Sequence, residues 1–150
     1  DGKVVATKPL SYQGKLIENF WIRFENGKVV EVYAESNQAL LEKMVSMDEG
    51  AAYLGEVALI AHDSPINNTR VLFYNTLFDE NASCHLALGR GFNACIENYD
   101  KYSVEELEKL GINSSMIHVD FMIGSEDMSI VGITKQGERV QVFKDGNWSF

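Results

Sequence analysis

Apolar and polar positions alternate through much of the first third of the chain. The clearest run covers residues 17–34 and is interrupted once, at Asn26-Gly27. Alternation with a period of two indicates strands, and Asn-Gly accepts the positive φ angles that a two-residue hairpin turn needs. The pattern therefore predicts a β-hairpin whose first strand has one apolar face, made of Phe20, Ile22 and Phe24.

Shorter runs of the same kind predict more strands. Branched aliphatic and aromatic residues recur in five further segments, which are residues 3–7, 54–60, 116–123, 129–133 and 138–143. Residues 84–89 are apolar but few, so a strand is favoured there while a helix stays an alternative. Gly14 predicts that residues 10–14 form a turn.

Two segments carry helical patterns. Ser36 is the expected N-cap of a helix that runs to Val45, and Ser103 with Glu106 forms a capping box before a short amphipathic helix. Together the elements predict an α+β fold, in which a mixed or antiparallel β-sheet with hairpins is combined with two or three helices. The length of 150 residues fits a single domain that spans residues 1–150.

Composition and charge restrict the possible partners. The formal net charge is -9 and the 13 Lys and Arg residues form no cluster, which argues against nucleic acid as a partner. No apolar run is long enough for a membrane span, so no membrane partner is expected. The two cysteines, Cys84 and Cys95, form no CxxC pair, and free thiols in the cytoplasm are expected.

Candidate chemistry begins at His118 and Asp120, which lie two residues apart in an apolar segment. Alternate residues of a strand share a face, so this imidazole and this carboxylate would project together. Glu56 and His85 are the other polar side chains that stand within apolar segments. Imidazole and carboxylate groups are the ligands of zinc, cobalt and manganese sites, and more than one carboxylate favours two metal ions over one.

Each of these residues also has a structural explanation, which the sequence leaves open. A histidine at a sheet edge is often satisfied by a neighbouring carboxylate, and Glu56 could lie at the exposed end of its strand. The spacing between the segments matches no short metal-binding motif such as HExxH. His62 lies in a polar loop, where histidines are more often solvated than bound to a metal.

Three sequence blocks give a more specific indication. Residues 54–59 (LGEVAL), 75–89 (NTLFDENASCHLALG) and 118–124 (HVDFMIG) resemble the M29 family of thermophilic metalloproteases, the aminopeptidase T-like and aminopeptidase S-like enzymes. The order, spacing and length of the blocks carry the resemblance, which extends over essentially the whole chain. It corresponds only to the C-terminal part of a family member, so we expect the C-terminal metal-binding fragment of a longer two-domain enzyme.

The resemblance implies a co-catalytic two-metal aminopeptidase that removes N-terminal residues from peptides. It implies that two divalent metal ions, of zinc, cobalt or manganese, are bound by Glu56, His85, His118 and Asp120. The ions would activate a water molecule that attacks the scissile carbonyl, while a carboxylate, here assigned to Glu56, assists proton transfer. Peptide substrates and a second copy of the chain, as a homodimer, are the partners that we expect.

Two departures from the family pattern bear on activity. A further metal-binding glutamate of the family lies upstream of Asp1, so this chain is expected to hold an incomplete ligand set and to be inactive by itself. In the family, a tyrosine thought to take part in catalysis follows the central histidine by seven residues, and Phe92 stands there in this chain. Phenylalanine cannot donate a hydrogen bond to a developing oxyanion.

Two alternatives to a peptidase stay open at this point. Phe92 is compatible with a catalytically degenerate binding or dimerisation module that keeps the fold. A different two-metal hydrolase, such as a phosphatase, would use the same ligands, although the sequence has no visible cluster of Arg or Lys to bind a phosphate.

Overall fold

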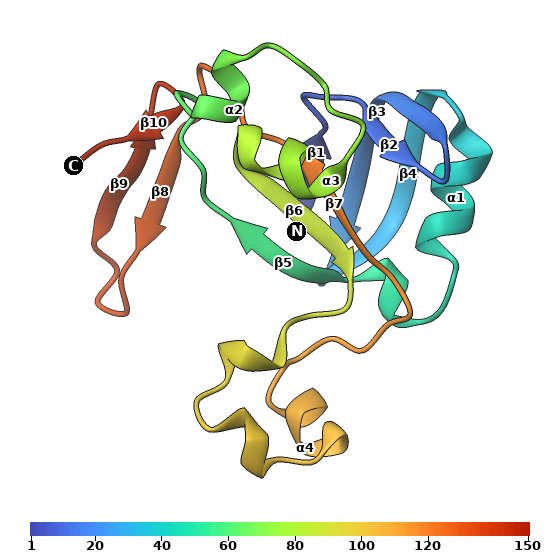
Figure 1. Cartoon of the computed structure of the whole chain (residues 1–150). Coiled ribbons are helices and arrows are strands. Elements are labelled where there is room, and N and C mark those ends of the chain that lie inside the picture. The colour runs from blue at the N-terminus through green and yellow to red at the C-terminus, as the bar shows by residue number, and fades with distance from the viewer.

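A long hairpin forms the centre of the first sheet. The computed structural model describes residues 1–150, and strands β3 (Lys15–Glu25) and β4 (Lys28–Ser36) pair along the hairpin (Figure 1). The turn residues Asn26 and Gly27 have φ angles of 50° and 77°, as a tight hairpin turn requires. The predicted hairpin is confirmed.

Strands β1 (Gly2–Val5) and β2 (Leu10–Tyr12) pair with opposite halves of β3. The prediction of a turn over residues 10–14 was therefore wrong in its first part. Leu10 is buried and pairs with Ile17, and burial of its apolar side chain favours an extended backbone there. The turn is confined to Gln13 and Gly14, which both have positive φ.

The second sheet consists of β5 (Leu54–Ala58), β6 (His85–Gly89) and β7 (His118–Met122), in that order. The short apolar run at residues 84–89 is therefore a strand, as favoured from the sequence. One face of this sheet packs against the first sheet in a common hydrophobic core, which includes Phe20, Ile22, Leu86, Leu88, Val119 and Phe121. The opposite face is left free for polar side chains.

The C-terminal part of the chain forms a third, separate sheet. It contains β8 (Ile130–Ile133), β9 (Arg139–Lys144) and β10 (Asn147–Trp148), which pair as two successive hairpins (Figure 1). The two predicted closing strands are confirmed. Every strand pair in the chain is antiparallel, so the fold is α+β with antiparallel sheets.

The two longer helices follow the sequence prediction. They are α1 (Gln38–Val45) and α4 (Val104–Lys109), and α4 lies in the connection between β6 and β7 that projects away from the sheets (Figure 1). Single-turn helices were not predicted, and these are α2 (Pro65–Asn68), α3 (Thr76–Asp79) and the 3₁₀ turns η1 (Gly50–Ala52), η2 (Glu80–Ala82), η3 (Asn93–Cys95) and η4 (Tyr99–Lys101). None of the helices has the length and hydropathy needed to cross a membrane.

The caps of the two longer helices differ in how well the sequence predicted them. The capping box is confirmed, because Ser103 Oγ accepts from the Glu106 N–H and Glu106 Oε2 accepts from the Ser103 N–H. Ser36, in contrast, belongs to β4, and the N-cap of α1 is Asn37 in a left-handed conformation with φ of 61°. The Asn37 amide donates to the Leu16 carbonyl oxygen at 2.6 Å, so it links α1 to β3 instead of capping the helix.

Candidate metal centre

The register of the second sheet aligns Glu56, Ala87 and Asp120 in one row across β5, β6 and β7. Residues in such a row project from the same face of a sheet, so two carboxylates flank one small side chain. The register of β5 shifts at Gly55, just before Glu56. A Cβ atom at Gly55 would lie 2.3 Å from the carbonyl oxygen of Arg90, so only glycine permits this close approach.

The two histidines join the same face through the two-residue period of a strand. His85 lies two positions before Ala87 on β6, and His118 lies two positions before Asp120 on β7. Alternate side chains share a face, which places both imidazoles beside the carboxylates. Gly89 is directly opposite His118 in the register, and a Cβ atom there would lie 2.2 Å from the carbonyl oxygen of Ile117, which precedes His118.

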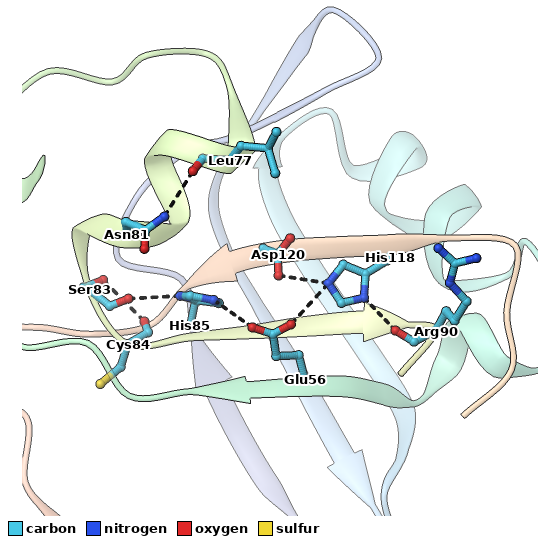
Figure 2. A network of polar contacts seen from close by, with 9 residues as sticks. All are labelled: Glu56, Leu77, Asn81, Ser83, Cys84, His85, Arg90, His118 and Asp120. Carbon is cyan, nitrogen blue, oxygen red and sulfur yellow. Dashed lines mark hydrogen bonds and ion pairs between the residues drawn. The ribbon is translucent and has the colours of Figure 1, made fainter. Parts of the chain in front are cut away.

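The four predicted ligands meet over this face of the sheet (Figure 2). Glu56 lies between the imidazoles, with Oε1 at 3.2 Å from His85 Nε2 and Oε2 at 3.5 Å from His118 Nε2. His118 Nε2 is also 3.3 Å from Asp120 Oδ1. Ligand atoms of Glu56, His85 and Asp120 all lie within 4.8 Å of one another. Each oxygen of Glu56 therefore faces a different histidine.

Backbone carbonyl groups determine which nitrogen of each imidazole carries the proton. His85 Nδ1 is 3.2 Å from the Ser83 oxygen, and His118 Nδ1 is 2.6 Å from the Arg90 oxygen (Figure 2). A carbonyl oxygen can only accept a hydrogen bond, so each Nδ1 is the protonated nitrogen. In the neutral ring, Nε2 then directs its lone pair at the carboxylate oxygens of Glu56, as in metal-binding histidines whose other nitrogen is held by a backbone carbonyl.

This arrangement fits a divalent cation. His85 is 3% exposed and Asp120 is 6% exposed, and Asp120 Oδ1 is buried without a hydrogen bond. Lone pairs and negative charges that face one another in a buried site are costly unless a proton or a cation lies between them. No Lys or Arg forms an ion pair with Glu56 or Asp120, and two imidazoles with two carboxylates are a donor set for zinc, cobalt or manganese.

A third carboxylate, Glu80, borders the cluster and was missed in the sequence. Burial, and secondly the nearby charge of Asp120, raise the pKa of the Glu80 carboxyl group. Glu80 belongs to the 3₁₀ turn η2. Figure 2 shows the next residue of this turn, Asn81, on the same side of the sheet as His85. Asp79-Glu80-Asn81 reads as an ordinary polar turn, and the only signal was its place inside the family-like block of residues 75–89.

Phe92 packs against His118 at the edge of the cluster. The two ring centroids are 4.7 Å apart, with an angle of 54° between the rings, and Phe92 is 48% exposed. Phe92, which stands where the family has a tyrosine, is therefore next to the proposed ligand His118. It contributes an apolar ring there, without a hydroxyl group.

Two other residues considered in the sequence lie outside the cluster. His62 belongs to the loop before α2, where its Nε2 atom is 3.3 Å from the amide nitrogen of Asn67. Cys84 donates from its thiol to the Ile60 carbonyl oxygen at 3.3 Å, so it forms no dyad with His85. Burial raises the pKa of the Cys84 thiol, which keeps it protonated and unreactive.

Comparison with known proteins points to the same chemistry. The model of a family described as thermophilic metalloprotease (M29) matches residues 1–148. The chain is 56% identical over 150 residues to aminopeptidase AmpS of Bacillus subtilis (strain 168), and 45% identical over 148 residues to aminopeptidase T of Thermus aquaticus. Among solved structures, wild-type AmpT from Thermus thermophilus matches with a TM-score of 0.87 at 41% identity.

The matches cover nearly all of this chain but only part of each relative. AmpS is matched over 100% of this chain and 37% of its own length, and aminopeptidase T over 99% and 36%. The AmpT structure is matched over 99% of this chain and 36% of that chain. The chain therefore spans little more than a third of the length of the proteins that it matches.

Proposed function

Because the chain belongs to the thermophilic metalloprotease (M29) family, we propose that it is the metal-binding catalytic part of an aminopeptidase. The relatives at 56% and 45% identity bear the name aminopeptidase. The observation that carries the proposal is the position of Glu56, whose two oxygens face the Nε2 atoms of His85 and His118 separately. A carboxylate placed in this way can bridge two ions, which favours a two-metal site over a single one.

The proposed ligands of the two divalent ions are Glu56, His85, His118 and Asp120. Zinc, cobalt and manganese all accept this donor set. Bound there, the ions would polarise the carbonyl group of a peptide bond and activate a water molecule for attack on it. The residues of the chain supply the geometry, because Glu56 joins the two halves of the site while the backbone holds each imidazole with Nε2 directed inward.

Two carboxylates are candidates for a catalytic role. Glu56 is the central catalytic carboxylate, since it contacts both imidazoles. Glu80 is the better proton acceptor, because burial and the charge of Asp120 raise the pKa of its carboxyl group and bring it towards the range where a base works near neutral pH. We assign to Glu80 the transfer of a proton from the attacking water to the leaving amine.

The length of the relatives suggests how the whole enzyme is organised. They are matched over only 36% or 37% of their length, and we propose that the chain acts as the C-terminal part of a longer two-domain enzyme. This enzyme would act on peptides as a homodimer, and the chain by itself, which spans little more than a third of the length of its relatives, would be inactive. The free thiols of Cys84 and Cys95 support a cytoplasmic location.

Hydrolysis by the protein at its full natural length tests the proposal. After a chelator has removed bound metal, Co²⁺, Zn²⁺ or Mn²⁺ is restored, and free peptides are compared with N-acetylated peptides and phosphoesters as substrates. We expect cleavage only with metal and a free N-terminus. Glu56→Gln should lower kcat/KM by about 100-fold or more, the size expected when a catalytic carboxylate is lost, whereas Glu49→Gln, at an exposed position, should have no effect. Phosphoester hydrolysis without peptide hydrolysis would contradict the proposal.

Phe92 favours one competing function, a binding or dimerisation module in which the fold persists without catalysis. Its ring stands beside His118 and cannot donate a hydrogen bond to a developing oxyanion. Peptide turnover by the metal-loaded protein would exclude this alternative. Bound metal without turnover, in an otherwise folded protein, would establish it in place of the aminopeptidase.

A further inference from the structure

A residue outside the ligand set, Asn113, binds the backbone segment that orients His118. The Asn113 amide nitrogen donates to the carbonyl oxygens of Gly89, at 2.6 Å, and of Gly50, at 2.8 Å. Its backbone carbonyl oxygen accepts a hydrogen bond from the Gly91 N–H at 2.9 Å. Asn113 is half-buried and contacts this segment at two successive peptide units.

The second of these peptide units joins Arg90 to Gly91 and has two partners. Its N–H donates to Asn113, and its C=O accepts from His118 Nδ1 at 2.6 Å. A trans peptide unit is planar, and its N–H and C=O point in opposite directions. The Asn113 main-chain carbonyl therefore fixes the direction of the carbonyl group that His118 contacts, and the Asn113 side chain, bound to Gly50 and Gly89, fixes the position of that main chain.

Main-chain atoms of neighbouring segments pack closely against residues 89–91. A Cβ atom at Gly89 would lie 2.2 Å from the Ile117 carbonyl oxygen, and the Arg90 N–H donates to the same oxygen at 2.7 Å. Apart from His118 itself, the side chain that donates to this segment is the Asn113 amide. It is therefore the point where a substitution can loosen the segment without changing a ligand.

We propose that Asn113 is a positioning residue of the metal centre. By fixing the segment from Gly89 to Gly91, it keeps His118 protonated on Nδ1, so that Nε2 stays directed at Glu56 and Asp120. This inference rests on the proposed function, because that function identifies the bound species as a divalent metal ion. Groups that hold a metal-binding histidine in this way typically change metal affinity by about 10-fold to 100-fold when they are removed.

The test uses Asn113→Ala in the protein at its full natural length, with two measurements. Calorimetric titration of the metal-free protein with Co²⁺ gives the affinity, and nitrogen NMR of labelled histidine gives the tautomer of His118 in the metal-free state. We expect Co²⁺ affinity to fall about 10-fold or more and the share of the Nε2-protonated tautomer to rise. Unchanged affinity and an unchanged tautomer would overturn the proposal.

A matched control and a second variant keep the test decisive. Asn67→Ala also removes an amide that donates to a backbone carbonyl oxygen, that of His62 at 2.9 Å, and should leave both measurements unchanged. If Asn113→Ala does not fold, Asn113→Asp keeps the volume and replaces the donor by an acceptor, and it should show the same two effects. Wild-type values in a folded Asn113→Asp protein would overturn the proposal.

The two proposals fail in different ways. If the unaltered protein binds no Co²⁺, the proposed metal-dependent function fails, while the tautomer of His118 still decides whether Asn113 positions it. If the unaltered protein binds Co²⁺ and the Asn113 variants bind it equally well with the same tautomer, only the role of Asn113 is overturned.

Discussion

At the level of single residues, the direction of each imidazole nitrogen decides what the cluster can bind. His85 and His118 each donate from Nδ1 to a backbone carbonyl oxygen, which leaves Nε2 for Glu56 and Asp120. A proton on Nε2 would compete with a metal ion for the same lone pair. The Nδ1-protonated form of both rings therefore leaves the nitrogen that faces the carboxylates available to a metal ion.

A substitution of Glu80 should affect proton transfer without affecting metal binding. If it accepts the proton, Glu80→Gln should lower kcat by about 100-fold or more, the size expected for loss of a general base. The affinity for metal should change little, because the four proposed ligands are kept. Steady-state kinetics of the full-length protein, together with metal titration of the same samples, measure the two effects.

The exposed Glu108 provides the control for Glu80. Glu108→Gln removes the same charge on the solvent side of α4 and should leave kcat and metal affinity unchanged. A large loss of metal affinity in Glu80→Gln would instead make Glu80 a ligand. An unchanged kcat would exclude it from proton transfer.

At the level of elements, the register of the second sheet creates the site. The apolar runs of β5, β6 and β7 predicted strands, and the polar residues within these runs are the four candidate ligands that the structure brings together. The register could not be predicted, because it depends on the bulge at Gly55 and on long connections between the strands. The position of Ala87 between the carboxylates of Glu56 and Asp120 becomes visible only when the three strands are aligned.

Asp48 fixes the segment that leads into β7, and its role gives a pH dependence. It accepts hydrogen bonds from the Met116 N–H, the Ser115 hydroxyl and the Ala51 N–H, of which the Met116 bond is the largest cause of the lowered pKa of Asp48. A carboxyl whose folded pKa is lowered stabilises the protein above its ordinary pKa of 3.8. This stabilisation is lost as the pH falls through the folded value.

We expect Asp48→Asn to lower the free energy of unfolding by about 1 kcal/mol at pH 7, through weaker hydrogen bonds to a neutral side chain. The difference from the unaltered chain should begin to shrink below about pH 4, where the Asp48 carboxyl group of the unfolded chain starts to be protonated. Urea unfolding at pH 7 and at pH 3 measures both values. Asp100→Asn, at an exposed position, should show no such difference, and an equal loss at both pH values would contradict the role of Asp48.

At the level of the whole molecule, the sequence predicted the fold class and failed where local signals compete with distant contacts. The hairpin of β3 and β4 followed from alternation and Asn26-Gly27, and the M29 resemblance from contiguous blocks. Leu10 was assigned to a turn because its pairing with Ile17 lies outside any local pattern. The contacts of Glu80 with Asp120 and of Asn113 with Gly50 could not be predicted, since they join residues that are distant in sequence.

Anomalous diffraction from crystals of the full-length protein grown with Zn²⁺, recorded at the zinc edge, tests the metal centre most directly. We expect anomalous peaks between Glu56, His85, His118 and Asp120, with Nε2 of each histidine at about 2.0–2.1 Å from a metal ion. Two peaks that share Glu56 would establish the two-metal site. The absence of a peak among these residues, or zinc bound only elsewhere, for example at His62, would contradict it.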